Sequence, residues 1–350
     1  MIMSRVHEGK KLPPGWIKCE SRKFLGSCYF FDTQTGTSRW FPPEADAPPP
    51  APAFTPHSPP SSPPPLDDDE DDEAVVPQPP AKRARPGGTA ASGEKGVKVA
   101  VIVPYRDSDP AQRRAAHLEQ FVPYMDEFLQ NLPGVAAFRV YIVEQSADGR
   151  KFNRGKLLNI GFDVAKREGF AAFVFHDVDL LPSEELGKWY SEIPERPVHI
   201  ARVWKQYSNN PKYFGGVVSF NGEDFEAING FPNTFWGWGG EDDELYSRIV
   251  EVGLKPQSAE RGEFADLEGL HLQTKLGLLR KNEHWKCQVK QEALQEHGTT
   301  WNQNGLADLD YTILERTFLA DSTEKVTVDV KFNDHWTDKI TRYQDLPKKS

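Results

Sequence analysis

The sequence predicts an α/β fold with a central, mostly parallel sheet, together with a small antiparallel unit before it. From residue 96 onward, apolar runs typical of buried strands alternate with segments of helical spacing. Charged side chains directly follow two of these strands, at the end where α/β sheets bind ligands. Before residue 45, aromatic clusters alternate with turn residues, which is typical of short antiparallel strands.

The composition narrows the classes of protein that this chain can be. It has 350 residues, 29 prolines and an apolar content of 38%, which fits a folded part joined to an extended one. A formal net charge of −10 argues against a general nucleic-acid binder. Three cysteines do not make a disulfide framework and indicate a reducing compartment. With no signal peptide and no apolar run of ~20 residues, we expect a cytoplasmic or nuclear protein without a membrane span.

Residues 10–44 are predicted to form the small antiparallel unit. Its clusters are Leu12-Pro-Pro-Gly-Trp16, Tyr29-Phe-Phe-Asp32 and Ser38-Arg-Trp-Phe-Pro-Pro43, which predict three short strands. With two tryptophans, a central aromatic pair and a final proline, the unit resembles a WW domain. The resemblance implies that Tyr29 and Trp40 form a groove for a Pro-rich peptide. The alternative is a disordered tail rich in aromatic residues.

Residues 45–95 are predicted to be a disordered linker. They are Pro-rich, then acidic from Asp67 to Glu73, then basic at Lys82-Arg-Ala-Arg85. Such a segment cannot bury enough apolar surface to fold. The basic run is either a nuclear import signal or a solvated charge cluster.

Residues 96–335 are predicted to form the α/β domain. Strands are expected at 97–104, 138–144 and 171–176, with a closing strand at 326–332, and helices at 111–132, 154–168 and 245–252. Pro104-Tyr-Arg106 and Asp177-Val-Asp179 follow the first and third strands. Since the carboxyl ends of parallel strands meet at one edge of a sheet, both segments should line one crevice.

The loop Phe231-Pro-Asn-Thr-Phe-Trp-Gly-Trp-Gly-Gly-Glu-Asp-Asp-Glu244 is the most unusual stretch of the chain. It places two tryptophans among three glycines and then four consecutive acids. Bulky rings beside freely rotating backbone suit a loop that moves over a ligand, and adjacent carboxylates suit a site for a sugar, a cation or a proton. The alternative is a core tryptophan pair that runs into an acidic first turn of a helix. A second glycine pair, Gly215-Gly216, predicts close approach of a ligand or of backbone.

Four motifs in order identify a resemblance to a known family. They are Phe152-Asn-Arg-Gly-Lys-Leu-Leu-Asn-Ile-Gly-Phe162, Phe175-His-Asp-Val-Asp-Leu-Leu-Pro182, Tyr213-Phe-Gly-Gly216 and Asn229 through Asp243. From Pro104 to at least Tyr311 the chain resembles a β-1,4-galactosyltransferase catalytic domain with a GT-A fold. The resemblance implies metal-dependent, inverting transfer of galactose from UDP-galactose to a glycan or glycosylated protein.

The resemblance also implies which residues act. The catalytic set is Asp242 as the base, its neighbour Glu241, and Trp238 as a lid over the donor. Asp179, Glu268 and His271 would bind Mn²⁺, and the carboxylate of Glu268 would make the site more tolerant of Mg²⁺. The residues implied for binding the UDP-sugar are Pro104, Tyr105, Arg106, Phe152, Arg154, Asp177, Val178, Tyr213, Gly216 and Trp238.

The sequence departs from the family in three respects. Ser108 stands where the family usually has a second arginine, and Arg113 and Arg114 are the candidates to replace it. Animal relatives are membrane-anchored Golgi enzymes, whereas no anchor is recognisable here. A WW unit is foreign to the usual architecture, so the rival hypothesis is a WW adaptor that carries a non-catalytic GT-A fold.

Overall fold

The computed structural model describes most of the α/β domain and parts of the N-terminal unit. The described residues are 3–4, 6–7, 10–12, 14–20, 28–34, 38–39, 96–207, 212–282 and 285–331. The predicted linker 45–95, Trp40 of the predicted peptide groove and residues 332–335 lie outside them.

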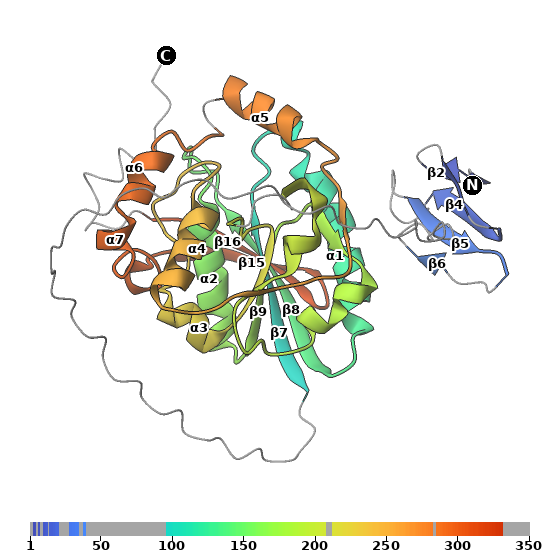
Figure 1. Ribbon diagram of the computed structural model, residues 1–350, viewed down its shortest axis with the longest axis horizontal. Coiled ribbons are helices and arrows are strands. Elements are labelled where there is room, and N and C mark those ends of the chain that lie inside the picture. Colours follow the sequence, from blue (N-terminus) through green and yellow to red (C-terminus); the bar gives the residue numbers. More distant parts are fainter. Residues whose placement is uncertain are drawn as a thin grey trace, which may run out of the picture.

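An eight-stranded sheet forms the centre of the α/β domain (Figure 1). Its strand order is β13-β11-β12-β9-β7-β8-β16-β15. In the middle, β7 runs parallel to both β8 and β9, and β8 runs parallel to β16, so the predicted α/β class with a mostly parallel centre is confirmed. The bounds are β7 (Val97–Tyr105), β8 (Val135–Gln145), β9 (Ala172–His176), β11 (Val198–His199), β12 (Val217–Asn221), β13 (Gln257–Ser258), β15 (Thr312–Ala320) and β16 (Thr323–Asp329).

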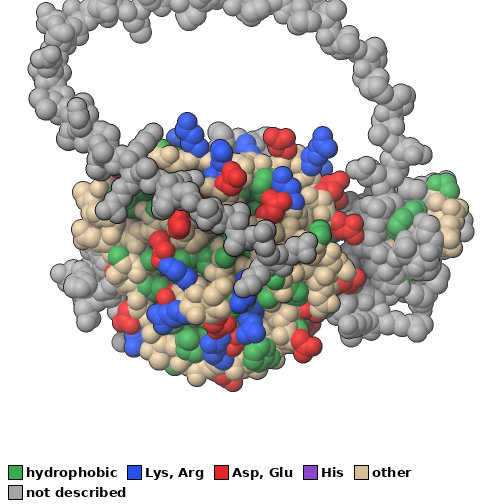
Figure 2. Space-filling model, turned by 90° about the horizontal axis from the view of Figure 1, so that it is seen from below, with side chains coloured by type: hydrophobic (Ala, Val, Ile, Leu, Met, Phe, Trp, Pro, Cys, Tyr) green, Lys and Arg blue, Asp and Glu red, His purple; other side chains and the backbone are tan. Residues whose placement is uncertain are grey.

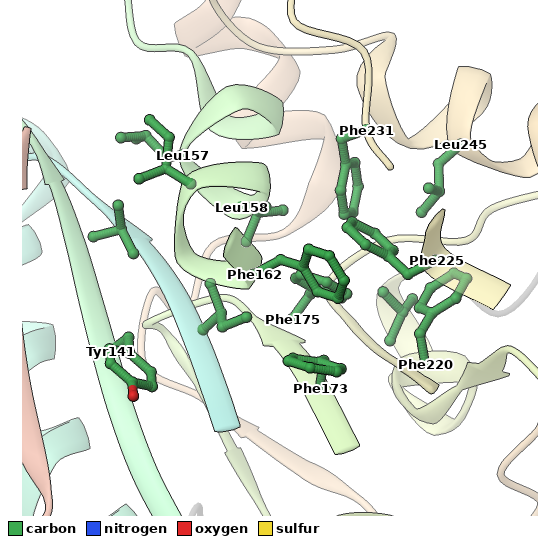
Figure 3. Packing of buried hydrophobic residues seen from close by; sticks show 14 of the residues in the cluster. Tyr141, Leu157, Leu158, Phe162, Phe173, Phe175, Phe220, Phe225, Phe231 and Leu245 are labelled. Carbon is green, nitrogen blue, oxygen red and sulfur yellow. The ribbon is translucent and has the colours of Figure 1, made fainter. Parts of the chain in front are cut away.

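Helices cover both faces of this sheet and create two hydrophobic cores. On one face α2 packs with the loop before α4, around the phenylalanines that Figure 3 shows. On the other face α1 contributes Phe121, Met125 and Leu129, which are at most 1% exposed. The helices are α1 (Arg114–Gln130), α2 (Arg154–Arg167), α3 (Gly222–Ala227), α4 (Glu241–Glu251), α5 (Leu272–Lys281), α6 (Lys290–Gln295) and α7 (His297–Thr300), and a short side sheet pairs β10 (Leu180–Pro182) with β14 (Phe264–Asp266).

Two helices begin elsewhere than the sequence suggested. The helix expected from 111 starts at Arg114, because Pro110–Gln112 forms a 3-10 turn and Arg113 adopts left-handed torsions, with φ 53°. The helix expected from 245 starts at Glu241, so the four acids form the first turn of α4. Carboxylates are favoured there, because the amide groups of a helix N-terminus carry partial positive charge.

The N-terminal unit contains an antiparallel sheet with the order β1-β4-β5-β6. The three predicted clusters contribute β4 (Trp16–Glu20), β5 (Cys28–Asp32) and β6 (Ser38–Arg39), and β1 (Met3–Ser4) adds a strand beyond β4. Two further strands, β2 (Val6–His7) and β3 (Lys10–Lys11), form a separate pair. The assignment of this unit as a WW domain stays a prediction.

Two further features concern membrane-spanning helices and surface charge. Within the described ranges, no helix is long and apolar enough to cross a membrane. Figure 2 shows basic and acidic side chains intermixed on the face of the domain seen from below. The net negative charge of the whole sequence is therefore not seen on that face as a patch of acidic side chains alone.

Candidate active site

A cavity opens where β7 and β9 end, at the carboxyl edge of the sheet. It gathers most of the predicted donor-binding residues, since Pro104, Tyr105, Arg106, Phe152, Arg154, Asp177, Val178 and Trp238 all line it. Asp179, Glu241 and Glu268 line it as well. Tyr213, Gly216, Asp242 and His271 do not, so the structure places these four predicted residues beside the cavity or away from it.

The two aspartates after β9 are positioned by backbone contacts on both sides. The amide of Asp177 donates to the carbonyl of Gly216 at 3.0 Å, and the carbonyl of Asp179 accepts from the amide of Leu267 at 2.8 Å. Gly216 has φ 74°, a left-handed conformation that favours glycine. Gly216 therefore helps to position Asp177 although it does not line the cavity, and its predicted contact with the donor stays a prediction.

Arg154 is the electrostatic centre of the site. Its Nε and Nη2 lie 2.9 Å and 2.8 Å from Asp177 Oδ1, and its Nη1 lies 2.9 Å from Asp242 Oδ1 and 3.6 Å from Glu241 Oε1. Arg154 begins α2, where the side chain of Asn153 caps the helix by accepting from the amide of Lys156. Helix capping therefore fixes the position from which this guanidinium reaches three carboxylates.

Three carboxylates around one guanidinium leave an excess of negative charge. Burial raises the pKa of Asp242 well above its ordinary value, and Glu241 and Asp177 raise it further, while Arg154 opposes the shift. Burial also raises the pKa of Glu241 and of Asp177. One cation cannot neutralise three anions, so the cluster raises the proton affinity of its carboxylates, and once ionised such a carboxylate accepts a proton more strongly than an ordinary one.

Asp242 packs directly against the glycine pair that the sequence singled out. A Cβ on Gly215 would lie 2.1 Å from Asp242 Oδ2 and 2.9 Å from Cε2 of Tyr213. Any side chain at position 215 would therefore displace the carboxylate or the tyrosine ring. The sequence predicted close approach of a ligand or of backbone at this glycine pair, whereas the group that lies against Gly215 is a side chain, the carboxylate of Asp242.

One carboxylate oxygen of Glu241 has no protein partner. Glu241 is 6% exposed, and its Oε2 is buried without a hydrogen bond. A buried polar atom without a partner is costly, and such atoms in a cavity wall often await a ligand. A sugar hydroxyl would satisfy this oxygen.

Trp238 projects from a loop that is anchored by its backbone. Its amide donates to the carbonyl of Trp285 at 2.6 Å, its carbonyl accepts from Cys287, and Gly237 donates to Phe152. The Trp238 side chain itself remains 41% exposed. Gly237 has φ 92°, and a Cβ there would lie 2.7 Å from the carbonyl carbon of Lys286. The glycine is therefore required both by torsion and by space.

The three predicted metal ligands are only partly together. Arg114 joins the first two, with Nη1 2.7 Å from Asp179 Oδ2 and Nη2 3.5 Å from Glu268 Oε1. His271 is exposed at the start of α5 and lines a different hollow, beside Trp204. Among the described residues, no group of three His, Cys, Asp or Glu side chains is arranged to hold a metal ion.

The pair Asp179 and Glu268 nevertheless suits a cation. Burial raises the pKa of Asp179, but Arg114 and Lys275 outweigh burial and hold this pKa well below its usual range. Lys275 Nζ also lies 2.6 Å from Glu268 Oε2. Two carboxylates that already attract cationic groups fit a hard divalent ion. The three-ligand set stays a prediction, and His271 is the member that the structure places away from the other two.

The structure adds cationic residues that the sequence left open or missed. Arg114 lines the cavity together with Ser108, whereas Arg113 is exposed and does not line it. Lys275 was missed, although its place four residues after His271 on a helical segment was a usable signal. Arg106 lines the cavity while its Nη1 donates to the carbonyl of Arg150 at 2.6 Å.

Comparisons with known proteins agree with this geometry. Residues 82–191 match a family described as the N-terminal region of glycosyl transferase group 7, and residues 195–271 match one described as the N-terminal domain of galactosyltransferase. Human beta-1,4-galactosyltransferase 3 is 32% identical over 252 residues, which is 68% of this chain and 56% of that protein. Mouse beta-1,4-galactosyltransferase 1 is 38% identical over 161 residues, 45% of this chain and 38% of that protein. The chain thus spans about half the length, or less, of these curated relatives.

A solved structure is similar over nearly its whole length. The catalytic domain of Drosophila beta1,4galactosyltransferase 7, in complex with xylobiose, matches with a TM-score of 0.56 and 30% identity, covering 69% of this chain and 98% of that one. A mutant of the same domain, in complex with manganese, UDP-Gal and xylobiose, matches equally well. With the sequence motifs, the mixed sheet and the cavity at its carboxyl edge, these matches show that the chain belongs to the β-1,4-galactosyltransferase family.

Proposed function

We propose that this protein is an inverting, metal-dependent galactosyltransferase that moves galactose from UDP-galactose to a glycan hydroxyl in β-1,4 linkage. The single observation that supports this most is the cavity at the ends of β7 and β9. It brings together residues from four separate parts of the chain that the family resemblance assigned to the donor. The buried free oxygen of Glu241 in its wall gives a sugar hydroxyl a place to bind.

Asp242 is the proposed general base. It would take the proton from the acceptor hydroxyl as that oxygen attacks the anomeric carbon and the bond to UDP breaks, in one displacement with inversion. Its raised pKa makes it a stronger base than an ordinary surface aspartate. Arg154 holds one of its oxygens at 2.9 Å, which fixes the orientation of the carboxylate.

The donor diphosphate needs positive charge in the same cavity. Arg106, Arg114 and Lys275 line it and would contact phosphate oxygens. Asp179 and Glu268 would hold the divalent cation, which neutralises charge on the leaving diphosphate. Trp238 would cover the donor and exclude water, which otherwise competes as the acceptor.

Transfer assays test this proposal. Wild type should move galactose from UDP-galactose to a xylose-terminated acceptor in the presence of Mn²⁺, since the Drosophila relative was solved with these ligands. Asp242→Asn should lose about 100- to 10,000-fold in kcat, the usual contribution of a general base. Asp321→Asn is the matched control, because Asp321 lies exposed in the turn between β15 and β16.

Equal turnover by wild type and Asp242→Asn would remove Asp242 from its role. No stabilisation of the wild-type protein by any nucleotide sugar in a thermal-shift screen with Mn²⁺ would favour the adaptor hypothesis instead.

The N-terminal unit is proposed to bind Pro-rich peptides. Support comes from the sequence pattern and from the antiparallel strands β4, β5 and β6, the second of which carries Tyr29. Titration of the full chain with a Pro-rich peptide should give saturable binding that Tyr29→Ala weakens while transferase activity stays unchanged. Binding that is unaffected by Tyr29→Ala would contradict the predicted groove.

A further inference from the structure

The proposed base, Asp242, lies against Gly215, and the backbone of Gly215 is itself held by a hydrogen bond. Arg154 binds Oδ1 of Asp242, and Gly215 lies against Oδ2, so the two oxygens of this carboxylate have a guanidinium and a stretch of backbone as their neighbours. The contacts that hold the backbone of Gly215 therefore help to set the position of the Asp242 carboxylate.

His199 holds it. This residue ends β11, is 2% exposed, and its Nε2 lies 3.0 Å from the carbonyl oxygen of Gly215. A carbonyl can only accept, so Nε2 carries the proton and donates it. Burial lowers the pKa of His199 to about 4, and the imidazole is therefore neutral near pH 7.

The same imidazole also contacts the two aromatic residues before Gly215. Its ring centroid lies 5.4 Å from that of Tyr213, nearly edge-on, and 5.1 Å from that of Phe214. His199 is itself anchored by the sheet, where it pairs with Val218 of β12 and its carbonyl accepts from Ala259. His199, held by strand pairing on both sides of β11, thus contacts each residue from Tyr213 to Gly215.

Gly215 is required at this position by space alone. Positive φ values occur at Gly216 but not at Gly215, so backbone torsion does not demand a glycine there. The demand comes from Asp242 Oδ2, which would lie 2.1 Å from any Cβ.

We infer that His199 and Gly215 are positioning residues that orient the carboxylate of Asp242 to take the proton from the acceptor hydroxyl. His199 fixes the Gly215 carbonyl, and Gly215 supplies the surface on which the carboxylate rests. This inference rests on the proposed function, because it assigns a role in the same reaction. Neither residue touches the reacting atoms, and both act on the carboxylate of Asp242, so their effect should fall on kcat more than on binding of the UDP part of the donor.

Kinetics of matched variants test the inference. Gly215→Ala should lower kcat about 100-fold, because a displacement of about 1 Å in a reacting group has that order of effect. Gly222→Ala is the control, since a Cβ there meets no atom nearer than 3.5 Å. His199→Met removes the N–H donor and should lower kcat about 10-fold, whereas His199→Gln keeps an N–H donor and should recover most of the loss. Affinity for UDP, measured by calorimetry, should stay at the wild-type value in all four variants.

Crystal structures of the variants separate this inference from the proposed function. If the wild-type protein has no transferase activity, the proposed function is wrong. The positioning role of His199 and Gly215 is then tested only by where the crystal structures of the variants place the carboxylate of Asp242. Displacement of its carboxylate in Gly215→Ala and His199→Met, but not in His199→Gln, supports it. An unmoved carboxylate, or equal kcat in His199→Met and His199→Gln, overturns it, and the His199 pair decides if Gly215→Ala does not fold.

Discussion

Arg248→Met should strongly destabilise the domain, because it breaks a fully buried ion pair in α4. The guanidinium donates twice to Glu244 Oε1, at 3.0 Å and 2.5 Å, and both side chains are at most 1% exposed. It also donates to the carbonyls of Asn229, Gly230 and Asn304 at 3.1, 3.0 and 2.6 Å. Removal of one partner of a buried pair costs about 3–5 kcal/mol, since it leaves an uncompensated charge, here that of Glu244. The loss of these three further hydrogen bonds places the expected destabilisation at the upper end of that range, although the carbonyl of Asn229 keeps the bond from the amide of Leu306.

Urea denaturation of the full chain, followed by tryptophan fluorescence, measures this loss. The control is Arg167→Met, which breaks another i,i+4 pair, with Asp163, at a residue whose side chain is 73% exposed. That substitution should cost under about 1 kcal/mol. The double variant Glu244→Gln/Arg248→Met should recover part of the loss, because no buried charge remains. A loss below about 1 kcal/mol in Arg248→Met would refute the reasoning, since it would mean that the Glu244 charge finds water or a proton at little cost.

Three further predictions concern the cavity. The pKa of Asp242 is raised in the folded state, so the contribution of this residue to stability is lost as the pH rises through that pKa. Asp242→Asn cannot ionise, and its melting temperature should therefore exceed that of wild type at pH 8 but not at pH 4. A difference in melting temperature that does not depend on pH would contradict the raised pKa. Arg114→Gln should weaken UDP binding about tenfold in calorimetry, the scale of one charge-assisted hydrogen bond, whereas the exposed neighbour Arg113→Gln should not. Gly237→Ala, at φ 92° and with backbone 2.7 Å from the new Cβ, should raise the KM for UDP-galactose, while Gly277→Ala, with nothing within 4 Å, should leave it unchanged.

The centre of the fold could be predicted from sequence because its strands are continuously apolar. The expected strands at 97–104 and 171–176 match β7 and β9 within a residue or so. Such runs are buried on both faces of a parallel sheet, and composition alone therefore marks them. The strand β15 escaped notice because its residues are mostly exposed and carry no alternating pattern. The pairing of β16 with β8 could not be predicted either, because local sequence patterns do not specify which distant strand a strand pairs with.

The residues of the candidate site also fall into two groups, those that the sequence could indicate and those that only the structure shows. The family motifs pointed to Arg154 and Asp177, and both line the cavity, because each stands next to a strand or helix end where the fold itself fixes the side chain. Their roles in donor binding stay predictions. His271 could be assigned only by spacing from Glu268, and spacing does not determine where a turn points its side chains. The role of Gly215 required the structure, because the space it leaves is filled by Asp242, from a different part of the chain.

The position of β16 has a consequence for how this protein is made. This strand lies inside the sheet, between β8 and β15, although it is the last strand of the described chain. Until the ribosome has released residues 323–329, β8 presents an unpaired edge that could associate with other nascent chains. Completion of the sheet must therefore wait for the end of the domain, and synthesis halted before that point would yield an aggregation-prone intermediate in which β8 lacks its partner.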